Sequence, residues 1–309
     1  MTKLAYVFPG QGSQEVGMLQ DVASEVAPLF EEASTVLGYD LWSLVANGPA
    51  EELNQTEFTQ PALLTASVGL FRYAIDQGLP RPDIVAGHSL GEYSALVAAG
   101  VLDFRDAVAL VQKRGQLMQS AVPMGQGGMA AVLGLDDDQV TEVCAAASQG
   151  DEIVQAVNFN APGQVVIAGV NAALERAIDG CKAAGARRAM PLSVSAPFHS
   201  VMMKPAAEAM AAELAAVTFN PPVVPVVQNV DARIEQDPAA IRANLVTQMY
   251  SAVLWTGTIQ TMAGEGAATI IECGPGKVLS GLCKRIDKSI AALNITGADL
   301  SAVSEALSS

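Results

Sequence analysis

A serine and a histidine far apart in the chain have the surroundings that nucleophilic catalysis requires. Ser89 lies in Gly87-His-Ser-Leu-Gly91, a G-x-S-x-G pattern, and His199 lies in a Pro-Phe-His-Ser segment. In a nucleophile elbow the two glycines allow a strand and the following helix to approach closely, and the serine hydroxyl is exposed in a strained turn. Serine needs an adjacent base to take its proton, and histidine is the commonest one. The pair predicts a serine acyl-enzyme site.

The residues on either side of Ser89 favour the elbow over an ordinary glycine-rich turn with an incidental serine. Ile84, Val85 and Ala86 are typical of the end of a buried strand, and apolar residues recur at helical spacing from Glu92 onward. Strand followed by helix is the context that the motif requires. The helix N-terminus would then direct its N–H groups and its dipole at an oxyanion on the bound acyl group.

The chain has only two histidines, and His199 is the better candidate for the base. His88 is adjacent to Ser89, and neighbouring side chains on a tight turn diverge, so we expect His88 to be structural or to line the pocket. A carboxylate that could orient His199 is not evident, because most Asp residues between Asp106 and His199 fall on helices remote from the predicted cleft. We expect another acceptor, such as a main-chain carbonyl.

Two further residues could contribute to such a site, and each allows two interpretations. The loop Gly10-Gln-Gly-Ser13 lacks the Lys-Ser/Thr of a phosphate loop; it either brings Gln11 to an oxyanion or is a plain turn after a strand. Arg114 lies in an apolar helical segment, where burial requires an anionic partner. That partner is either a ligand carboxylate, which suits the planar guanidinium, or an internal Asp or Glu.

The order of predicted elements indicates an α/β core interrupted by a small α+β unit. Strands are expected at 4–8, 84–86, 223–227 and 267–272, and helices at 22–37, from Pro61 to 78, after Glu92, and at 105–122, 202–217 and 237–249, with helical fragments at the end. Residues 128–194 read β-α-β-β-α-β, which is the ferredoxin-like pattern. We therefore predict a hydrolase-like core with a parallel sheet and a nucleophile elbow (1–126 and 196–309) and a ferredoxin-like inserted subdomain (127–195).

Composition excludes several other classes of protein. Half of the 309 residues are hydrophobic and only 16% are charged, as in a compact enzyme with a large core. The net charge of −15 argues against nucleic-acid or anionic-membrane partners. Four widely spaced cysteines without a C-x-x-C pair predict free thiols and no metal site. The N-terminus does not read as a signal peptide and no apolar run has the length of a membrane span, so we expect a cytoplasmic protein.

Five segments together resemble the malonyl-CoA:acyl carrier protein transacylase family, and the resemblance covers nearly the whole chain. They are, in family order, Phe8-Pro-Gly-Gln-Gly-Ser13, Gly87-His-Ser-Leu-Gly-Glu92, Lys113-Arg114-Gly, Ala196-Pro-Phe-His199 and Glu272-Cys-Gly-Pro-Gly276. The family has a hydrolase-like α/β core with a ferredoxin-like insert, as predicted above. One departure is that Ser251-Ala252 follows Tyr250, where family members often have Asn-Pro or Ser-Pro.

The resemblance implies a role for each matching residue. Ser89 would carry the acyl group in a ping-pong transfer from malonyl-CoA to the phosphopantetheine thiol of acyl carrier protein, with His199 as its base. Gln11 and the Leu90 N–H would form the oxyanion hole, and Arg114 would bind the malonyl carboxylate. The resemblance also implies that the bulky ring of Phe198 disfavours α-branched acyl groups. It further implies that the main-chain carbonyl of Gln248 orients His199. No cofactor is implied, and we expect a monomer.

Two other classes of function remain open from the sequence alone. A thioesterase or esterase would use the same Ser-His pair and pass the acyl group to water, whereas a non-catalytic role would leave the motif residues without a purpose. The acidic carrier protein would need a local basic surface on this acidic chain. The candidates, which could equally be ordinary solvated charges, are Lys182, Arg187, Arg188, Lys204, Lys277, Lys284, Arg285 and Lys288.

Overall fold

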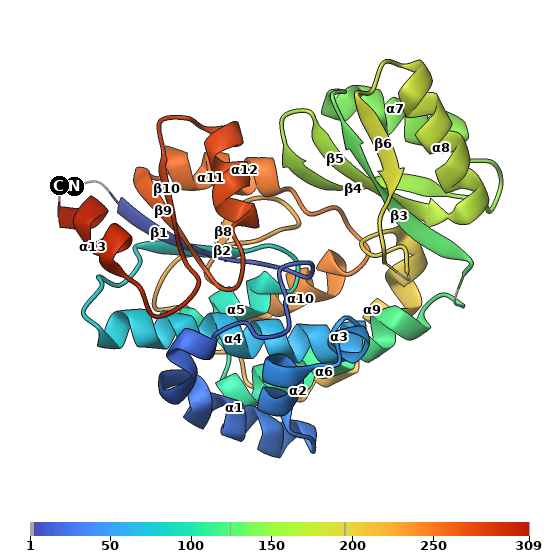
Figure 1. Cartoon of the computed structure of the whole chain (residues 1–309). Helices are drawn as coiled ribbons and strands as arrows, with labels where there is room; N and C mark the ends of the chain where they lie inside the picture. Colours follow the sequence, from blue (N-terminus) through green and yellow to red (C-terminus); the bar gives the residue numbers. More distant parts are fainter. Residues whose placement is uncertain (1–2, 124, 195, 309) are drawn as a thin grey trace.

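The computed structural model describes residues 3–123, 125–194 and 196–308, which contain two β-sheets (Figure 1). The larger sheet has the strand order β10-β9-β1-β2-β7-β8, in which every neighbouring pair is parallel except β7 with β8. Its strands are β1 (Lys3–Phe8), β2 (Ile84–Gly87), β7 (Val226–Val227), β8 (Ile234–Glu235), β9 (Ala267–Cys273) and β10 (Ala291–Ile295). The predicted α/β core with a mainly parallel sheet is confirmed.

Helices cover both faces of this sheet, and the alternation of β1 shows how. Tyr6 and Phe8 point to one face, where their rings contact Phe71 edge-on at 5.6 and 5.9 Å between centroids. Ala5 and Val7 point to the other face, into a separate apolar cluster. Since successive side chains of a strand alternate between faces, an apolar run without polar interruptions is expected for a strand buried on both sides.

The helices fall into two groups around the sheet (Figure 1). α11 (Trp255–Gly264) and α12 (Val278–Ile286) pack on the face of Ala5 and Val7. On the opposite side lie α1 (Ala23–Leu37), α2 (Leu41–Asn47), α3 (Ala50–Leu53), α4 (Thr56–Asp76), α5 (Gly91–Ala98), α6 (Phe104–Ser120), α9 (Lys204–Ala215) and α10 (Pro238–Gln248). The 3₁₀ turns η1 (Gln20–Val22) and η2 (Val201–Met203) precede α1 and α9, and α13 (Ser301–Ser308) ends the described chain.

The sequence prediction was wrong about where α4 begins. Proline is favoured in the first turn of a helix, so Pro61 was expected to open it. The helix instead begins at Thr56, and Pro61 lies inside it. Fifteen of its 21 residues are buried, from Thr56 to Ala74. Burial of nearly every face of the helix compensates for the hydrogen bond that Pro61 cannot donate.

Other differences concern short elements and the end of the chain. The residues expected to form helical fragments include β10, an edge strand of the large sheet. The short helix α3 was not predicted either. The strand predicted at 223–227 is shorter, and α2, α11 and β8 were not predicted. Each of these missed elements is brief or depends on partners remote in the sequence, which periodicity does not register.

A four-stranded antiparallel sheet forms the inserted unit, at the upper right of Figure 1. Its order β4-β5-β3-β6, with α7 (Asp137–Ala147) and α8 (Asn171–Ala183) packed on one face, matches the predicted ferredoxin-like pattern. The strands are β3 (Gly127–Leu133), β4 (Val154–Ala161), β5 (Gln164–Val170) and β6 (Arg188–Pro191). The predicted boundary residue Ser195 lies outside the described residues.

Main-chain hydrogen bonds connect the inserted sheet to the core. The N–H of Phe159 on β4 donates to the carbonyl of Val253 at 3.0 Å, and the N–H of Val253 donates to the carbonyl of Val157 at 2.9 Å. Side chains on the face of the inserted sheet opposite α7 and α8, including Met129 and Val166, join the main apolar core. In the described ranges no helix is long and apolar enough to cross a membrane.

Candidate active site

The turn between β2 and α5 is the predicted elbow, and two glycines make it possible. Ser89 has a left-handed backbone with φ of 53°, a conformation that L side chains adopt only when the surroundings hold it. A Cβ on Gly87 would lie 1.9 Å from the main chain of Gly91, and one on Gly91 would lie 2.1 Å from the Phe8 carbonyl oxygen. Only glycine fits where strand and helix pass this closely.

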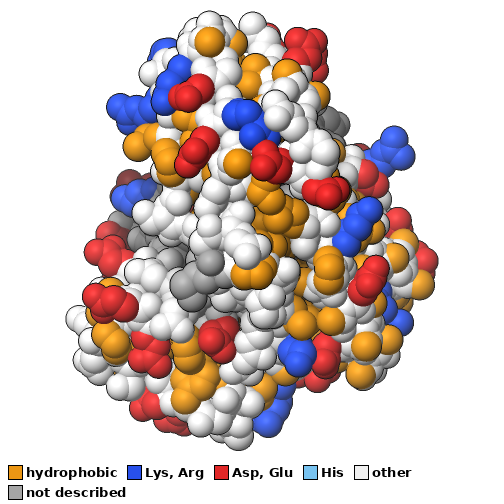
Figure 2. Space-filling model, turned by 90° about the vertical axis from the view of Figure 1, so that its right-hand side faces the viewer, with side chains coloured by type: hydrophobic (Ala, Val, Ile, Leu, Met, Phe, Trp, Pro, Cys, Tyr) orange, Lys and Arg blue, Asp and Glu red, His pale blue; other side chains and the backbone are white. Residues whose placement is uncertain are grey.

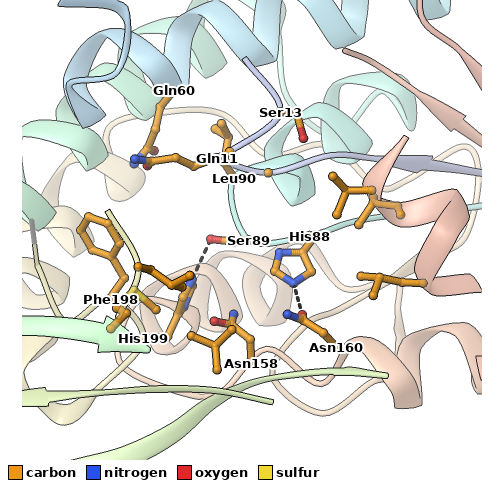
Figure 3. Close-up of a pocket in the computed structure, with 18 of the residues that line it drawn as sticks. Gln11, Ser13, Gln60, His88, Ser89, Leu90, Asn158, Asn160, Phe198 and His199 are labelled. Atoms are coloured by element: carbon orange, nitrogen blue, oxygen red, sulfur yellow. Dashed lines mark hydrogen bonds between the residues drawn. The ribbon is translucent and has the colours of Figure 1, made fainter. Parts of the chain in front are cut away.

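The elbow brings Ser89 directly to His199. The Ser89 Oγ lies 2.7 Å from the His199 Nε2 (Figure 3). The His199 Nδ1 lies 2.8 Å from the main-chain oxygen of Gln248. A carbonyl oxygen can only accept, so Nδ1 carries the proton and Nε2 is left to accept the serine proton. The acceptor is thus a main-chain carbonyl, although Ser251-Ala252 follows Tyr250 in this chain.

Burial keeps this imidazole neutral. His199 is 5% exposed, and burial together with the nearby positive charge of Arg114 lowers its pKa to about 3. A neutral imidazole is the form that can take a proton. His88, by contrast, has its Nε2 2.8 Å from the Oδ1 of Asn160 and its ring against Trp255. It lines the pocket on the other side of the elbow (Figure 3).

Arg114 extends from α6 to the same serine. Its Nη2 donates to the Ser89 Oγ at 3.1 Å and to the Gln248 Oε1 at 2.8 Å, and its Nη1 donates to the Gln60 Oε1 at 2.9 Å. The side chain is 1% exposed. Among the ion pairs of the described residues none involves Arg114. The internal-salt-bridge interpretation therefore fails here, and a buried cation remains beside the nucleophile with only neutral oxygens as hydrogen-bond acceptors.

The predicted oxyanion donors also lie at this pocket. Leu90 lines the cavity and comes immediately before α5, so its main-chain N–H is at the helix N-terminus, where the helix dipole favours an oxyanion. Gln11 follows β1 and lines the cavity, with its Nε2 3.4 Å from the Thr56 Oγ1. That long contact leaves the amide able to turn toward an oxygen on the acyl group. Phe198 is 8% exposed and lines the cavity beside His199 (Figure 3).

The cavity lies between the core and the inserted sheet and has a volume of about 270 Å³. The inserted unit contributes Met129, Asn158, Asn160 and Leu192, and α12 contributes Val278, Leu279 and Leu282. Leu192 and Val278 are 37% and 52% exposed, so the wall is apolar where it meets solvent. Such a cavity suits a slender acyl chain with one charged end. In the described ranges no group of three or more His, Cys, Asp or Glu residues could hold a metal ion.

Sequence reasoning missed several buried amides that hold the site together. Gln60 accepts from Arg114, and Asn229 bonds to both the N–H of Ser89 and the carbonyl of Gly87. Asn and Gln are common in loops and helices, so no spacing distinguished these two. Glu92 had a signal, since a carboxylate within an apolar segment beside the nucleophile is unusual, but no role was predicted for it.

Comparisons with known proteins agree with this geometry. The family described as "Acyl transferase domain" matches residues 5–299. The malonyl CoA-acyl carrier protein transacylase of Escherichia coli K12 is 58% identical over 94% of this chain and 95% of its own, and that of Haemophilus influenzae is 54% identical over 99% and 100%. This chain belongs to the malonyl CoA-acyl carrier protein transacylase family.

Solved structures of transacylases have the same fold. A Vibrio cholerae acyl carrier protein S-malonyltransferase superposes with a TM-score of 0.95 at 55% identity, covering 98% of this chain and 100% of its own. A malonyl-transacylase solved in complex with a type II PKS acyl-carrier protein superposes with a TM-score of 0.94 at 53% identity, covering 96% and 97%. The hydrolase-like core and the inserted antiparallel sheet are therefore features of the transacylase fold.

Proposed function

We propose that this chain transfers a malonyl group from malonyl-CoA to the phosphopantetheine thiol of acyl carrier protein through an ester on Ser89. The observation that carries the proposal is the contact of one serine oxygen with both a neutral imidazole and a buried guanidinium. The imidazole explains how the serine becomes a nucleophile, and the guanidinium explains why the acyl group carries a carboxylate.

In the first half-reaction the Ser89 Oγ attacks the thioester carbonyl while the His199 Nε2 takes the hydroxyl proton. The carbonyl oxygen becomes an oxyanion facing the N–H of Leu90 and the amide of Gln11. When the C–S bond breaks, His199 returns the proton to the departing sulfur of CoA. In the second half-reaction the carrier thiol gives its proton to His199 and attacks the Ser89 ester. When the ester C–O bond breaks, His199 passes that proton to the departing Ser89 Oγ, which restores the free serine and the neutral imidazole.

Arg114 supplies the selectivity in this proposal. Among the described residues the Nε of its buried guanidinium has no hydrogen-bond partner, and its other two nitrogens donate to neutral oxygens. A carboxylate entering the cavity would gain charge-assisted hydrogen bonds there, whereas an uncharged acetyl group would not. Phe198 limits the width of the cavity near the carbon that bears the carboxylate.

We also propose that the chain acts as a monomer, because one chain supplies all of these groups. The cytoplasmic location stays a prediction.

Intact-protein mass spectrometry after mixing with malonyl-CoA tests the reaction. We expect a malonyl adduct on the wild type, none on Ser89→Ala, and loss of the adduct with malonylation of the carrier when acyl carrier protein is added. His199→Ala should slow adduct formation by a factor of about 10²–10⁴, the usual effect of losing a positioned base. An adduct that decays to free malonate at one rate with or without the thiol would identify a hydrolase.

Two substitutions test the assigned roles. His88→Ala should do less damage than His199→Ala, since the His88 ring bonds to Asn160 and not to the serine; the reverse order in folded proteins would give the role of base to His88. Arg114→Ala should lose acylation by malonyl-CoA while retaining acylation by acetyl-CoA. Equal loss with both substrates would contradict the carboxylate-binding role.

A further inference from the structure

Glu92 is a buried carboxylate that the proposed reaction does not use. It is the second residue of α5 and 1% exposed. Its Oε2 accepts from the Gln248 Nε2 at 2.9 Å and from the main-chain N–H of Asn229 at 3.1 Å, whereas its Oε1 is buried without a hydrogen-bond partner among the described residues. Burying a carboxylate with one unpaired oxygen is costly, so the presence of Glu92 at this buried position requires an explanation.

The side-chain amide of Gln248 connects Glu92 to Arg114. Its Nε2 donates to Glu92 and to the main-chain oxygen of Ser89 at 2.9 Å, and its Oε1 accepts from the Arg114 Nη2. A carboxylate can only accept and a guanidinium can only donate, so the two charged groups dictate the orientation of the amide between them. Arg114 is thereby fixed with Nη2 on the nucleophile.

Asn229 forms a second connection from Glu92 to the elbow. Its main-chain N–H donates to Glu92, its side-chain Oδ1 accepts from the Ser89 N–H at 2.7 Å, and its Nδ2 donates to the Gly87 carbonyl at 2.7 Å. These bonds hold the backbone of Ser89 in its left-handed conformation. One carboxylate oxygen thus supports both the nucleophile and the guanidinium beside it.

We propose that Glu92 is a positioning residue for acyl-group selection, because its Oε2 fixes the Gln248 amide that aims Arg114 at the acyl group on Ser89. The proposal rests on the proposed carboxylate-binding role of Arg114. It adds that this role depends on Glu92, which lies on the helix that follows the elbow. Glu92 contacts neither the acyl group nor the reacting atoms.

The charged and titratable groups that face Glu92 come from three elements. They are Arg114 on α6, Asp231 in the turn between β7 and β8, and Tyr93 on α5 itself. Burial raises the pKa of Glu92 to about 7 in spite of its hydrogen bonds to Gln248 and Asn229 and the charge of Arg114. A negative charge near the start of α5 would also interact favourably with the helix dipole. That purely structural explanation predicts a loss of stability without a change in substrate preference.

Two substitutions separate these explanations. Glu92→Gln can place its carbonyl oxygen where Oε2 now accepts both N–H groups, so it removes the charge and keeps the acceptor. Glu92→Met has a similar length and removes the acceptor. The readout is the ratio of kcat/KM for acylation by malonyl-CoA to that by acetyl-CoA, measured alongside thermal unfolding.

In folded Glu92→Met we expect the ratio to fall by about tenfold or more, the scale of a lost hydrogen bond to a charged group. Glu92→Gln should restore it to within about twofold of the wild type. A folded Glu92→Met with the wild-type ratio overturns the proposal. A Glu92→Gln in which the ratio falls as far as in Glu92→Met also overturns it.

Gln248→Met provides a second route to the same test if Glu92→Met does not fold. The substitution removes the side-chain amide that links Glu92 to Arg114 and keeps the main-chain carbonyl that accepts from His199. We expect the same fall in the ratio, and an unchanged ratio in folded Gln248→Met overturns the proposal. Arg114→Ala identifies which idea fails. If Arg114→Ala has the wild-type ratio, the carboxylate-binding role of Arg114 is wrong. If the ratio falls in Arg114→Ala but not in Glu92→Met or Gln248→Met, only the role of Glu92 is contradicted.

Discussion

Both proposed catalytic residues have backbone conformations that residues other than glycine rarely adopt. The φ angles are 53° at Ser89 and 62° at His199. Such conformations cost about 1–3 kcal/mol each and persist only when other contacts impose them. For Ser89 those contacts come from Asn229 and Gln248, and for His199 the imidazole is bonded at both nitrogens. The strain directs the hydroxyl and the imidazole toward one another in the cavity.

The low pKa of His199 predicts an unusual pH dependence. An ordinary imidazole, with a pKa of about 6.5, would be mostly protonated at pH 5.5. Only about a tenth of the molecules would then have the neutral imidazole that can act as a base. Because burial and Arg114 lower the pKa of His199 to about 3, the free enzyme keeps a neutral base across this range. We therefore expect kcat/KM for acylation by malonyl-CoA to show no acid limb with a midpoint near pH 6.5.

Rapid-quench measurement of adduct formation between pH 5 and pH 8 checks this expectation. Glu92→Gln is the control, since burial raises the pKa of Glu92 to about 7 and its titration falls in the same range. A midpoint near 6.5 in both proteins would mean that His199 titrates like an exposed histidine. A midpoint present only in the wild type would belong to Glu92.

At the level of single residues, the sequence predicted the groups whose chemistry is distinctive. A serine in an elbow, a histidine in a loop and an arginine among apolar residues stand out by type, and the structure places all three together. The position of the Gln248 carbonyl came from family resemblance. Gln60 and Asn229 could not be predicted because their function depends on what lies beside them, and a neutral amide is common in every kind of element.

At the level of the elements, the elbow depends on two glycines whose neighbours leave no space for a methyl group. Gly87→Ala would place its Cβ 1.9 Å from Gly91, so the strand and helix must separate and Ser89 must move. We expect a loss of about 1–3 kcal/mol in unfolding free energy, the usual scale for overpacking, together with loss of acylation. Denaturant unfolding and adduct mass spectrometry measure the two effects.

Gly281→Ala is the matched control for that substitution. Gly281 lies inside α12, and a Cβ there meets nothing within 4 Å. Alanine should stabilise this helix by about 0.5–1 kcal/mol because glycine loses more conformational freedom on folding. If Gly87→Ala and Gly281→Ala changed stability in the same direction, the close approach at the elbow would not be the reason for the glycine.

The accuracy of the element predictions followed the length and regularity of the patterns. Long periodic helices such as α1 and α6 were placed to within about two residues, since their apolar spacing and caps are local signals. β10 was missed because its identity as a strand depends on pairing with β9, and α4 was given a late start because proline has a stronger local preference than buried threonine and glutamine. The β-α-β-β-α-β order was sufficient to predict the inserted sheet.

At the level of the whole molecule, the net charge of −15 cannot attract an acidic carrier protein. On the face shown in Figure 2, basic and acidic side chains are interspersed above a central group of hydrophobic ones. Lys284 and Arg285 lie at the end of α12, whose other residues Leu279 and Leu282 line the cavity, and Arg285 bonds to Gln164 of the inserted sheet. They are therefore well placed to meet a carrier at the cleft.

Reversing both charges, Lys284→Glu with Arg285→Glu, should raise the KM for the carrier and leave acylation by malonyl-CoA nearly unchanged. Added salt should weaken the carrier step more than the decay of the acyl-enzyme, because exposed charges are screened. Steady-state kinetics with purified carrier protein measures both effects. Lys3→Glu with Arg81→Glu makes the same change in net charge near the N-terminal ends of β1 and β2, at the opposite end of these strands from Ser89. An equal effect of the two pairs would point to net charge and not to a docking surface.

The contacts that hold the nucleophile span large parts of the chain. Ser89 is 110 residues from His199, 140 from Asn229 and 159 from Gln248. During synthesis the elbow therefore leaves the ribosome long before the residues that orient and activate it. A nascent or prematurely terminated chain that ends before Gln248 carries the serine without a poised base or a positioned guanidinium. Incomplete copies of the protein should thus be unable to consume malonyl-CoA, and activity begins only when translation has passed α10.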